Sequence, residues 1–394
     1  MSTPPLSAIG ELVEPVSSWT PERGDPNDVF TYIDLSAVEQ DAKIISGTRE
    51  LACSDAPSRA RQLVRGGDVL VSTVRPNLNG VARVPPEFDG ATASTGFCVL
   101  RPKADRLDSQ YLYQWVKSPR FVSDMVRKAT GASYPAVSDC IVCESKLPLP
   151  PLPEQRRIAA ILDKADELRA KRRAALAKLD TLTQSIFLDM FGDPATNPKG
   201  FPFCPLQGVV KTDTIVTYGI VQAGDEFPGG VPYIRSGDIV DGEIVLDGLR
   251  HTTPVIADKF RRSRVETGEI VMSIRATVGT TALVPMSLDG ANLTQGTARI
   301  APGDTVERLY LLYLLRTPGT QHWIKLQIKG VTFHEITLTR LRELPVMVAP
   351  MNLQREFAQR AEVVAKLHAS QRYSLSELNG LFASLQQRAF RGEL

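Results

Sequence analysis

Apolar residues recur at alternating spacings of three and four positions between residues 154 and 190 of this 394-residue chain. This pattern predicts one long helix that carries a coiled-coil seam. The helix would be about 55 Å long at 1.5 Å per residue, and the glycine and proline of Phe191-Gly192-Asp193-Pro194 would end it. A second, more polar stripe follows residue 350 and ends near Phe390-Arg391-Gly392, so we expect the two helices to bury their stripes against each other. The positions predicted to pair the helices are Ile158, Ile161, Leu168, Leu179, Leu182, Ile186, Val364, Leu367, Leu378, Leu381 and Leu385.

Shorter apolar runs, cut by glycine and proline, predict strands in the rest of the chain. The runs at residues 68–72 and 96–100 are followed by one helical stretch at about 109–128. The second half repeats this order with a run at 269–273 and a helical stretch at about 306–316. Strands combined with one or two helices predict a mixed α/β (α+β) globule in each half.

The sequence carries the same domain twice. Five residues return 199 positions later, namely Tyr111, Pro119, Gly131, Gln155 and Arg156 as Tyr310, Pro318, Gly330, Gln354 and Arg355. Because each copy is long enough to bury a core of its own, the repeat is a duplicated domain and not a solenoid unit. The chain then divides into globular domains at residues 1–147 and 194–346, a proline connector with the first long helix at 148–193, and the second long helix at 347–394.

Composition excludes several classes of protein. The 43% hydrophobic and 23% charged residues are typical of a globular chain, so disorder and fibrous structure are not expected. We expect no signal peptide and no membrane contact, because no basic stretch precedes an apolar run and no such run could span a bilayer. Five scattered cysteines fit a location in the reducing cytoplasm. The net charge of +2 does not by itself indicate a nucleic-acid binder.

Motifs for catalysis are weak or absent in the sequence. It has no Asn-Pro-Pro-Tyr or Asp-Pro-Pro-Tyr segment of the kind that grips a flipped base, and no glycine-rich phosphate-binding motif. Glu144-Ser145-Lys146, with Asp124 or Asp139, resembles half of a nuclease site, but such triplets are common by chance. Cys140-Ile141-Val142-Cys143 has the spacing of metal ligands without a second pair, so a buried strand is expected there and no metal site.

Residues 149–159, Leu-Pro-Pro-Leu-Pro-Glu-Gln-Arg-Arg-Ile-Ala, resemble the first conserved helical region of the specificity subunit of type I restriction–modification systems. Segments in both halves are similar to the target-recognition domains of that family, at residues 32–36, 56–61, 72–77, 130–135, 218–222 and 231–239. The similarity covers essentially the whole chain in order. The second helix departs from the pattern, since Met351-Asn352-Leu353 stands where the first has Leu152-Pro153-Glu154.

The resemblance implies a non-catalytic subunit that recognises DNA. Its fold would be two tandem target-recognition domains, each followed by a long helix, with the helices paired as an antiparallel coiled coil. Each domain would read one half of a split, asymmetric site on double-stranded DNA. The helices would act as a ruler and as the platform for two methyltransferase subunits, which nuclease/translocase subunits would join. The complex would be an adenine-type DNA methyltransferase and ATP-dependent restriction endonuclease used in phage defence, with S-adenosylmethionine, ATP and Mg bound by the partners and none by this chain.

DNA contacts are expected from basic clusters that recur in both copies, because phosphates attract lysine and arginine whatever the base sequence. The loop after the shared glycine differs between the copies and is expected to read different base edges. The predicted contacts of the first domain are Arg59, Arg61, Arg65, Thr73, Arg75, Asn77, Lys128, Ser133 and Tyr134. Those of the second domain are Lys259, Arg261, Arg262, Arg264, Arg275, Thr277, Lys325, Lys329, Thr332, Phe333 and His334.

Two other functions stay open on the sequence. The chain could be an autonomous nuclease with an embedded site, in which case it would cut DNA with magnesium alone. It could also be a coiled-coil adaptor whose domains bind protein, and its binding would then be insensitive to salt, unlike binding to phosphates.

Overall fold

The chain folds into two compact units in the computed structural model, which describes residues 4–329 and 334–394. Unit 1 comprises Met1–Ala174 and Tyr373–Leu394, and unit 2 comprises Ala175–Arg372. Each unit therefore holds one copy of the repeat together with one part of each long helix. The division predicted from sequence treats the long helices as segments apart from the globular domains, whereas here their halves belong to the units.

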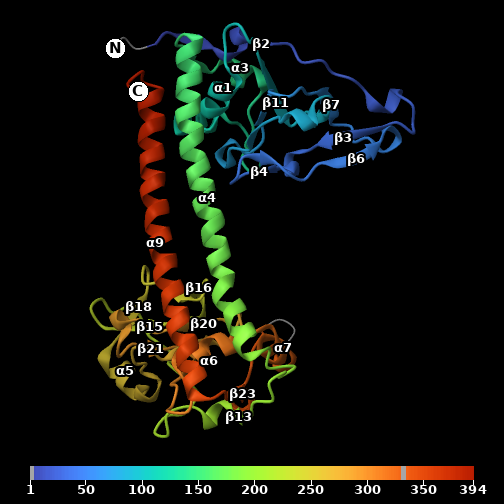
Figure 1. Cartoon of the computed structure of the whole chain (residues 1–394). Coiled ribbons are helices and arrows are strands. Elements are labelled where there is room, and N and C mark those ends of the chain that lie inside the picture. Colours follow the sequence, from blue (N-terminus) through green and yellow to red (C-terminus); the bar gives the residue numbers. More distant parts are fainter. Residues whose placement is uncertain (1–3, 330–333) are drawn as a thin grey trace. The chain divides into compact units, whose positions relative to one another are not determined.

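Unit 1 is a mixed α/β unit built on two four-stranded sheets (Figure 1). Its strands are β1 (Leu6–Ala8), β2 (Val13–Glu14), β3 (Val29–Ile33), β4 (Val38–Glu39), β5 (Ile44–Ile45), β6 (Arg49–Ala52), β7 (Ala60–Leu63), β8 (Val69–Ser72), β9 (Val81–Arg83), β10 (Thr92–Ser94), β11 (Phe97–Pro102) and β12 (Lys146–Pro148). Its helices are α1 (Ser109–Val116), α2 (Pro119–Lys128), α3 (Asp139–Glu144) and the first part of α4 (Leu152–Phe191). The sheets have the strand orders β6-β3-β10-β7 and β2-β11-β8-β9, and β1-β12 and β4-β5 form smaller pairs.

Unit 2 repeats this topology almost element for element. Its strands are β13 (Phe203–Pro205), β14 (Thr217–Tyr218), β15 (Val231–Ile234), β16 (Ile239–Val240), β17 (Glu243–Ile244), β18 (Arg250–Thr252), β19 (Ile270–Ser273), β20 (Thr281–Leu283), β21 (Asn292–Leu293), β22 (Thr297–Ile300) and β23 (Pro345–Met347). Its helices are α5 (Pro254–Lys259), α6 (Arg308–Leu315), α7 (Pro318–Gln327), α8 (Leu338–Arg342) and the first part of α9 (Met351–Ala389). The orders β14-β22-β19-β20 and β18-β15-β21 match the two sheets of unit 1, so the duplication and the mixed α/β class are confirmed.

The predicted helical stretch at 109–128 is two helices and not one. Lys117 and Ser118 separate α1 from α2, which begins at Pro119. The Ser118 hydroxyl accepts a hydrogen bond from the backbone N–H of Phe121, which caps the new helix, and proline is tolerated in a first turn because its missing N–H would be unpaired there. Unit 2 repeats the break, where Thr317 caps α7 before Pro318.

Residues that recur in both copies hold the same backbone joints. The Gln155 side chain accepts from the N–H of Asp108 across 2.8 Å and donates to the carbonyls of Arg106 and Pro150. Gln354 makes the same three bonds in unit 2, to Glu307, Thr305 and Ala349. The Tyr111 hydroxyl donates to Pro148 and that of Tyr310 to Met347. These echoed side chains therefore anchor each long helix to its domain.

The long helices run antiparallel, as expected. In unit 1 the start of α4, at Ile158 and Leu162, packs into one core with the end of α9, at Phe382 and Phe390. In unit 2 the end of α4 packs with the start of α9, where the rings of Phe187 and Phe357 lie 5.3 Å apart. The start of each helix thus meets the end of the other. Within the two described ranges, no helix is long and apolar enough to cross a membrane.

The structure corrects the predicted pairing face of these helices at four positions. Leu168, Leu182, Leu367 and Leu381 are 43%, 40%, 46% and 52% exposed. The side chains one position later face the other helix instead: Thr183 and Phe382 are buried, Arg169 donates to Asn379 across 2.7 Å, and His368 lies 2.9 Å from Asp180. Ile158 and Val364 are buried as predicted, and Ile161, Leu179, Ile186, Leu378 and Leu385 are half-buried. The predicted stripe and the buried stripe share one position in every heptad and differ by one residue at the other position. The spacing of apolar residues therefore does not decide which stripe faces the partner helix.

A turn after α4 caps α7 within unit 2. The carboxylate of Asp193 accepts the backbone N–H of Gly319 across 3.0 Å and that of Ala195 across 2.8 Å. An anionic group is favourable at a helix N-terminus because the first N–H groups lack partners there. A Cβ on Gly319 would lie 1.8 Å from Asp193 Oδ1, so only glycine admits this approach.

Replacing Gly319 with alanine is therefore expected to lower the free energy of unfolding of unit 2 by about 1–3 kcal/mol, because the carboxylate must leave the helix end. Hydrogen exchange of the α7 amides measures the loss. Arg120→Ala at the matching position of unit 1 is the control and should change stability by less than about 0.5 kcal/mol. Equal effects of the two substitutions would contradict the capping role of Asp193.

Candidate nucleic-acid interface

In unit 1 two loops from distant parts of the chain meet where β8 ends. The backbone N–H of Arg75 donates to the carbonyl of Pro135 across 2.7 Å. Val74 and Thr130 each form a β-bridge with Ala136. The segment after β8 and the segment after α2 are thus tied together, and the predicted contacts at residues 73–77 and 133–134 lie in one place.

Arg75 and Tyr134 form the exposed part of this loop pair. The Arg75 guanidinium carbon lies 4.7 Å from the centre of the Tyr134 ring, a cation–π contact, and Tyr134 is 69% exposed. Asn77 and Ser133 are also exposed. Thr73 is buried and its hydroxyl donates to Gly96, so it supports the loop from inside. A solvent-facing arginine on an aromatic ring can bond to or stack on a nucleic-acid base.

Unit 2 contains the same pair of loops with different side chains. The N–H of Ala276 donates to the carbonyl of His334 across 3.1 Å, and Arg275 and Lys329 each form a β-bridge with Glu335. The Arg275 guanidinium and the Glu335 carboxylate lie 3.1 Å apart as an ion pair. His334 and Thr277 are exposed, and the predicted contacts Thr332 and Phe333 lie outside the described residues.

The recurrence of basic residues after a strand in both copies predicts that Arg275 is the equivalent of Arg75, and the structure corrects this. The residue whose N–H bonds to the second loop is Arg75 in unit 1 but Ala276 in unit 2, and both have left-handed backbones, with φ of 50° and 61°. Arg275 therefore lies one position earlier, where unit 1 has Val74. The two arginines face different surroundings, because Arg75 lies over the Tyr134 ring and Arg275 pairs with Glu335.

The remaining basic candidates of unit 1 are spread along β7. Arg59 is exposed at the start of β7, and its carbonyl accepts the N–H of Thr95 next to the loop that holds Thr73. Arg61 pairs with Glu22 across 3.5 Å. Arg65 is exposed before the start of β8, whereas Arg75 follows the end of that strand. Of these three arginines, Arg59 is the one that lies beside the loop pair.

The basic candidates of unit 2 gather on α5 and on the 3₁₀ turn Arg261–Ser263. Asn292 ties this segment to β21 by donating to the carbonyls of Ala257 and Phe260. Lys259, Arg261 and Arg262 are exposed, and Arg264 lies 3.5 Å from Asp258. The segment therefore presents three exposed cations.

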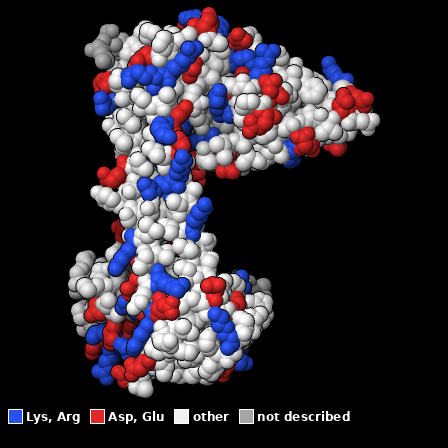
Figure 2. Space-filling view, in the orientation of Figure 1, with Lys and Arg blue, Asp and Glu red and all other residues white. Residues whose placement is uncertain are grey.

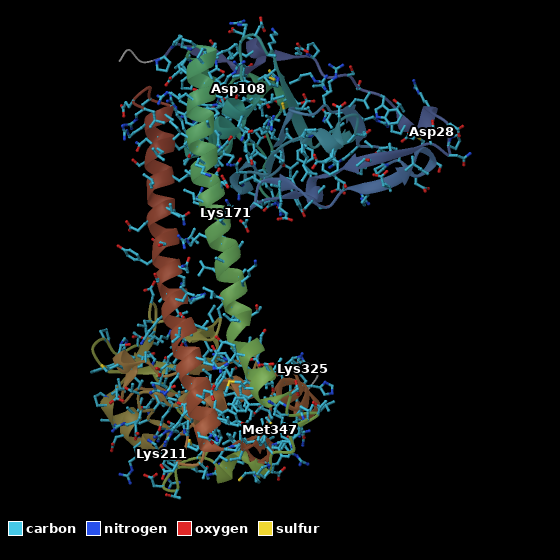
Figure 3. All side chains as sticks on the ribbon, viewed as in Figure 1. Asp28, Asp108, Lys171, Lys211, Lys325 and Met347 are labelled. Atoms are coloured by element: carbon cyan, nitrogen blue, oxygen red, sulfur yellow. The ribbon has the colours of Figure 1, made fainter. Side chains whose placement is uncertain are left out.

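Lysines flank the second loop in both units. Lys128 pairs with Asp124 across 2.9 Å at the end of α2. Lys325 is exposed on α7 (Figure 3), and Lys329 is exposed where its backbone pairs with Glu335. The described residues supply no carboxylate to Arg59, Arg65, Arg75, Lys259, Arg261, Arg262, Lys325 or Lys329.

The surface charge is mixed and not gathered into one basic stripe. Figure 2 shows Lys and Arg interspersed with Asp and Glu on the visible face of both units. This agrees with the net charge of +2. Any attraction for phosphates must therefore come from the local cations beside the loops.

Glu335 is a candidate site residue that the sequence patterns did not select. It holds Arg275 by the ion pair and Lys329 by two backbone hydrogen bonds. A carboxylate is unexpected among DNA contacts because it repels phosphates, although it can accept a hydrogen bond from a cytosine amino group. Its position right after His334, in the loop that differs between the copies, was the available signal.

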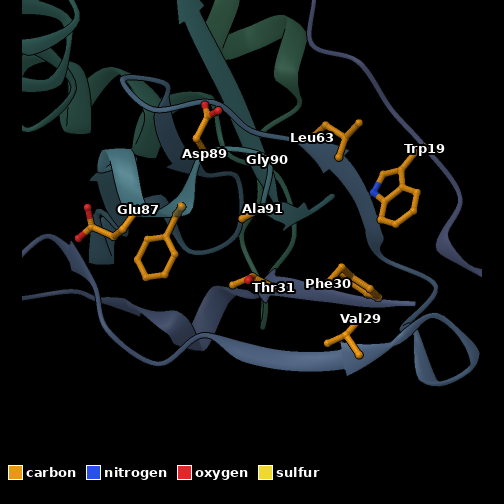
Figure 4. Close-up of a pocket in the computed structure, with 10 residues that line it drawn as sticks. Trp19, Val29, Phe30, Thr31, Leu63, Glu87, Asp89, Gly90 and Ala91 are labelled. Carbon is orange, nitrogen blue, oxygen red and sulfur yellow. The ribbon is translucent and has the colours of Figure 1, made fainter. Parts of the chain in front are cut away.

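A pocket of about 320 Å³ in unit 1 lies outside this interface (Figure 4). Trp19 and Phe30 line one side, and Glu87 and Asp89 line the other. Asp89 already accepts the N–H of Gly66 across 2.8 Å. Two carboxylates repel a phosphate backbone, so this pocket is not assigned to DNA.

The expected buried strand at residues 140–143 is wrong. These residues belong to helix α3, with Cys140 exposed and Cys143 half-buried. In the nuclease-like group, Asp124 is already paired with Arg127 and Lys128. Within residues 4–329 and 334–394, no cluster of three or more His, Cys, Asp or Glu side chains could hold a metal ion.

Cys143 is expected to react with iodoacetamide before Cys140 at pH 7.5, although Cys140 is more exposed. A hydrogen bond from Cys98 lowers the pKa of Cys143, whereas bonding to Glu144 raises the pKa of Cys140. The reactive thiolate of Cys143 therefore forms at lower pH than that of Cys140. Mass spectrometry of peptides alkylated between pH 6 and 9 tests this order, and earlier labelling of Cys140 would refute it.

Comparisons with known proteins agree on one family. The model of the type I restriction modification DNA specificity domain matches residues 61–178 and 211–376. The EcoBI specificity subunit of Escherichia coli is 26% identical over 327 residues, which cover 75% of this chain and 68% of that protein. The putative MjaX specificity subunit of Methanocaldococcus jannaschii is 22% identical over 325 residues, which cover 76% and 72%.

Solved structures give the same result. A chain from a study of complex assembly and conformational transition in the type I R-M system is 29% identical, covers 100% of both chains and has a TM-score of 0.66. The S subunit from M. genitalium is 14% identical, with coverage of 98% and 96% and a TM-score of 0.57, and is similar in fold alone.

Proposed function

We infer that this chain, which belongs to the family of type I restriction modification DNA specificity domains, recognises the DNA target of a type I restriction–modification system. The observation that carries this inference is the recurrence of one loop pair in both units with different side chains. A shared scaffold that presents Arg75 and Tyr134 in one unit and Arg275 and His334 in the other suits two readers of unlike sequences. The alternatives of an autonomous nuclease or a protein adaptor find no support in the family.

Each unit would read one half of a split site on double-stranded DNA. Because the two sets of exposed side chains differ, the two half-sites would differ and the target would be asymmetric. Exposed arginines can bond to guanine, and the lysines beside the loops can neutralise phosphates. The ion pair of Arg275 with Glu335 would orient that guanidinium before DNA arrives.

The long helices would link DNA recognition to the catalytic subunits. They would set the spacing between the half-sites, as a ruler, and would be the platform that binds two methyltransferase subunits, which nuclease/translocase subunits join. A 40-residue helix such as α4 is about 60 Å long at 1.5 Å per residue, which is more than one turn of duplex DNA. The chain would carry out no reaction itself. Adenine methylation and ATP-dependent cleavage, with S-adenosylmethionine, ATP and Mg, would belong to its partners in the cytoplasm.

The decisive experiment is single-molecule sequencing of modified bases in host DNA, with and without this chain, in the presence of its methyltransferase partner. We expect a split, asymmetric methylated motif that disappears without the chain. An unchanged methylation pattern would contradict the proposal.

A binding measurement separates the alternatives. The affinity of the purified chain for duplex DNA should fall steeply and linearly with the logarithm of salt concentration, because each neutralised phosphate releases counterions. Cleavage by the purified chain with magnesium alone would indicate a nuclease instead, and salt-insensitive binding to protein would indicate an adaptor.

A further inference from the structure

Unit 1 has an open groove of about 550 Å³ where the start of α2 meets the end of α9. Its apolar lining residues are Pro119, Ala383 and Phe390, and its polar lining residues are Ser118, Arg120, Gln386, Gln387 and Arg391. All of these residues belong to unit 1, so the groove is complete within one compact unit. Its lining contains two cations and no carboxylate.

The matching place in unit 2 is filled by the chain itself. Ser118, Pro119 and Arg120 correspond to Thr317, Pro318 and Gly319, each 199 residues later. There the turn after α4 seats Asp193 on the N–H of Gly319. Pro194 and Ala195 follow and leave a smaller groove of about 350 Å³ beside Trp323 and Pro345. The counterpart surface in unit 2 thus holds an acidic residue followed by small apolar residues.

The donors of the unit 1 groove are unused by the described residues. The backbone N–H of Arg120, the counterpart of the Gly319 N–H, finds no acceptor among them. The Arg120 guanidinium lies over the Trp115 ring at 5.8 Å, and neither it nor that of Arg391 pairs with a carboxylate in the described part of the chain. Apolar lining residues beside two arginines without a carboxylate partner in the described residues complement a segment that is small, apolar and acidic.

We propose that this groove binds a peptide segment of a partner protein that carries a carboxylate followed by proline or another small apolar residue. The carboxylate bonds to the guanidinium groups of Arg120 and Arg391, and the apolar residues cover Phe390. It does not copy the seat of Asp193, because a Cβ at the matching glycine would lie 1.8 Å from that carboxylate and Arg120 has a Cβ. The side-chain donors of the two arginines replace the backbone donor.

A peptide is favoured over a DNA phosphate because part of the groove lining is apolar. A phosphate needs cations but gains nothing from Phe390 and Ala383, and the counterpart surface in unit 2 holds protein. This inference does not depend on the proposed DNA function, since none of the predicted DNA contacts lines the groove.

The test measures fluorescence anisotropy of a labelled, end-blocked peptide, Phe-Gly-Asp-Pro-Ala-Thr-Asn, which copies residues 191–197, with the full chain. We expect saturable binding that weakens at least tenfold in Arg391→Gln, in Arg120→Gln and when asparagine replaces the aspartate of the peptide. Arg23→Gln is the matched control, because Arg23 is exposed in unit 1 and is no part of the groove, and it should leave the affinity unchanged. Thermal unfolding verifies that each variant is folded.

Three results would overturn the proposal. They are the absence of saturable binding up to millimolar peptide, equal affinity for the aspartate and asparagine peptides, and equal affinity of the Arg391→Gln chain. The proposal would also be refuted if the peptide did not bind and a short duplex of arbitrary sequence bound only when both arginines were present. That result would assign the groove to phosphate binding.

Discussion

Replacing Arg75 with alanine is expected to impair recognition of one half of the DNA target, and replacing Arg275 with alanine to impair recognition of the other. Each arginine belongs to a different unit and a different loop pair. Loss of an arginine that bonds to a base costs about 1–3 kcal/mol, which is roughly 5- to 150-fold in affinity for the correct half-site. The two variants should therefore relax different positions of the methylated motif.

The measurement is anisotropy with duplexes in which one half-site at a time is scrambled, once methylation mapping has revealed the motif. Arg75→Ala should no longer respond to scrambling of its own half-site and should still respond to the other. Arg23→Ala, an exposed change in unit 1 away from the loops, should behave as the unmodified chain. If Arg75→Ala and Arg275→Ala relax the same half-site, the two-reader model is refuted.

The environment of Arg275 sharpens this expectation. Its guanidinium is held by Glu335, whereas Arg75 rests on the Tyr134 ring. Glu335→Gln would leave the arginine in place with a weaker partner. It should change recognition of the same half-site as Arg275→Ala and leave the Arg75 half-site unaffected.

Replacing Leu162 with aspartate is expected to destabilise unit 1 by about 3–5 kcal/mol. Leu162 is 0% exposed in the core that joins α4, α9 and the domain. An aspartate there would lose the apolar contacts and bury a charge without a partner. The same substitution at Leu168 should cost less than about 1 kcal/mol, because that side chain is partly in solvent.

The pair of variants is matched, because both place aspartate inside the same helix and the intrinsic helix-propensity cost is shared. Urea unfolding followed by circular dichroism, with hydrogen exchange of the α1 and α2 amides to localise the change, measures the difference. If the substitution at Leu168 lowered the free energy of unfolding as much as the substitution at Leu162, Leu168 would lie on the pairing face as its spacing predicts. The assignment of the pairing face from burial would then be refuted.

Residues that echo between the two halves of the sequence proved to be scaffold residues. Gln155 and Gln354 make the same three backbone bonds, and Tyr111 and Tyr310 the same single bond. The positions around the meeting loops, in contrast, differ between the copies. Residues identical in both copies of the repeat therefore identified the structural framework of each unit. Residues that differ between the copies identified the surface of the loop pair.

The candidate site was only partly predictable for the same reason. The segments after β8 and after α2 were both selected, and the structure ties them together. The one-residue error arose because Arg75 and Arg275 are the arginines that follow matching apolar runs, whereas the backbone contacts of the loop pair Arg75 with Ala276. Glu335 was missed because its role depends on Arg275, which is 60 residues away in the chain.

The sequence by itself determined the duplication and the existence of two long helices, because recurring residues and apolar spacings indicate them. It also determined the family and the antiparallel pairing of the helices, because motifs along the chain resemble that family. Only the tertiary structure decided which stripe of each helix is buried, since Leu162 and Leu168 are equally apolar and the choice depends on Phe382 and Phe390 from the far end of the chain. The tertiary structure also decided that the turn at Asp193 fills one groove while its counterpart beside Arg120 stays open. The physical reason is common to both cases: burial and capping are contacts between residues distant in sequence, and local patterns leave more than one such contact available.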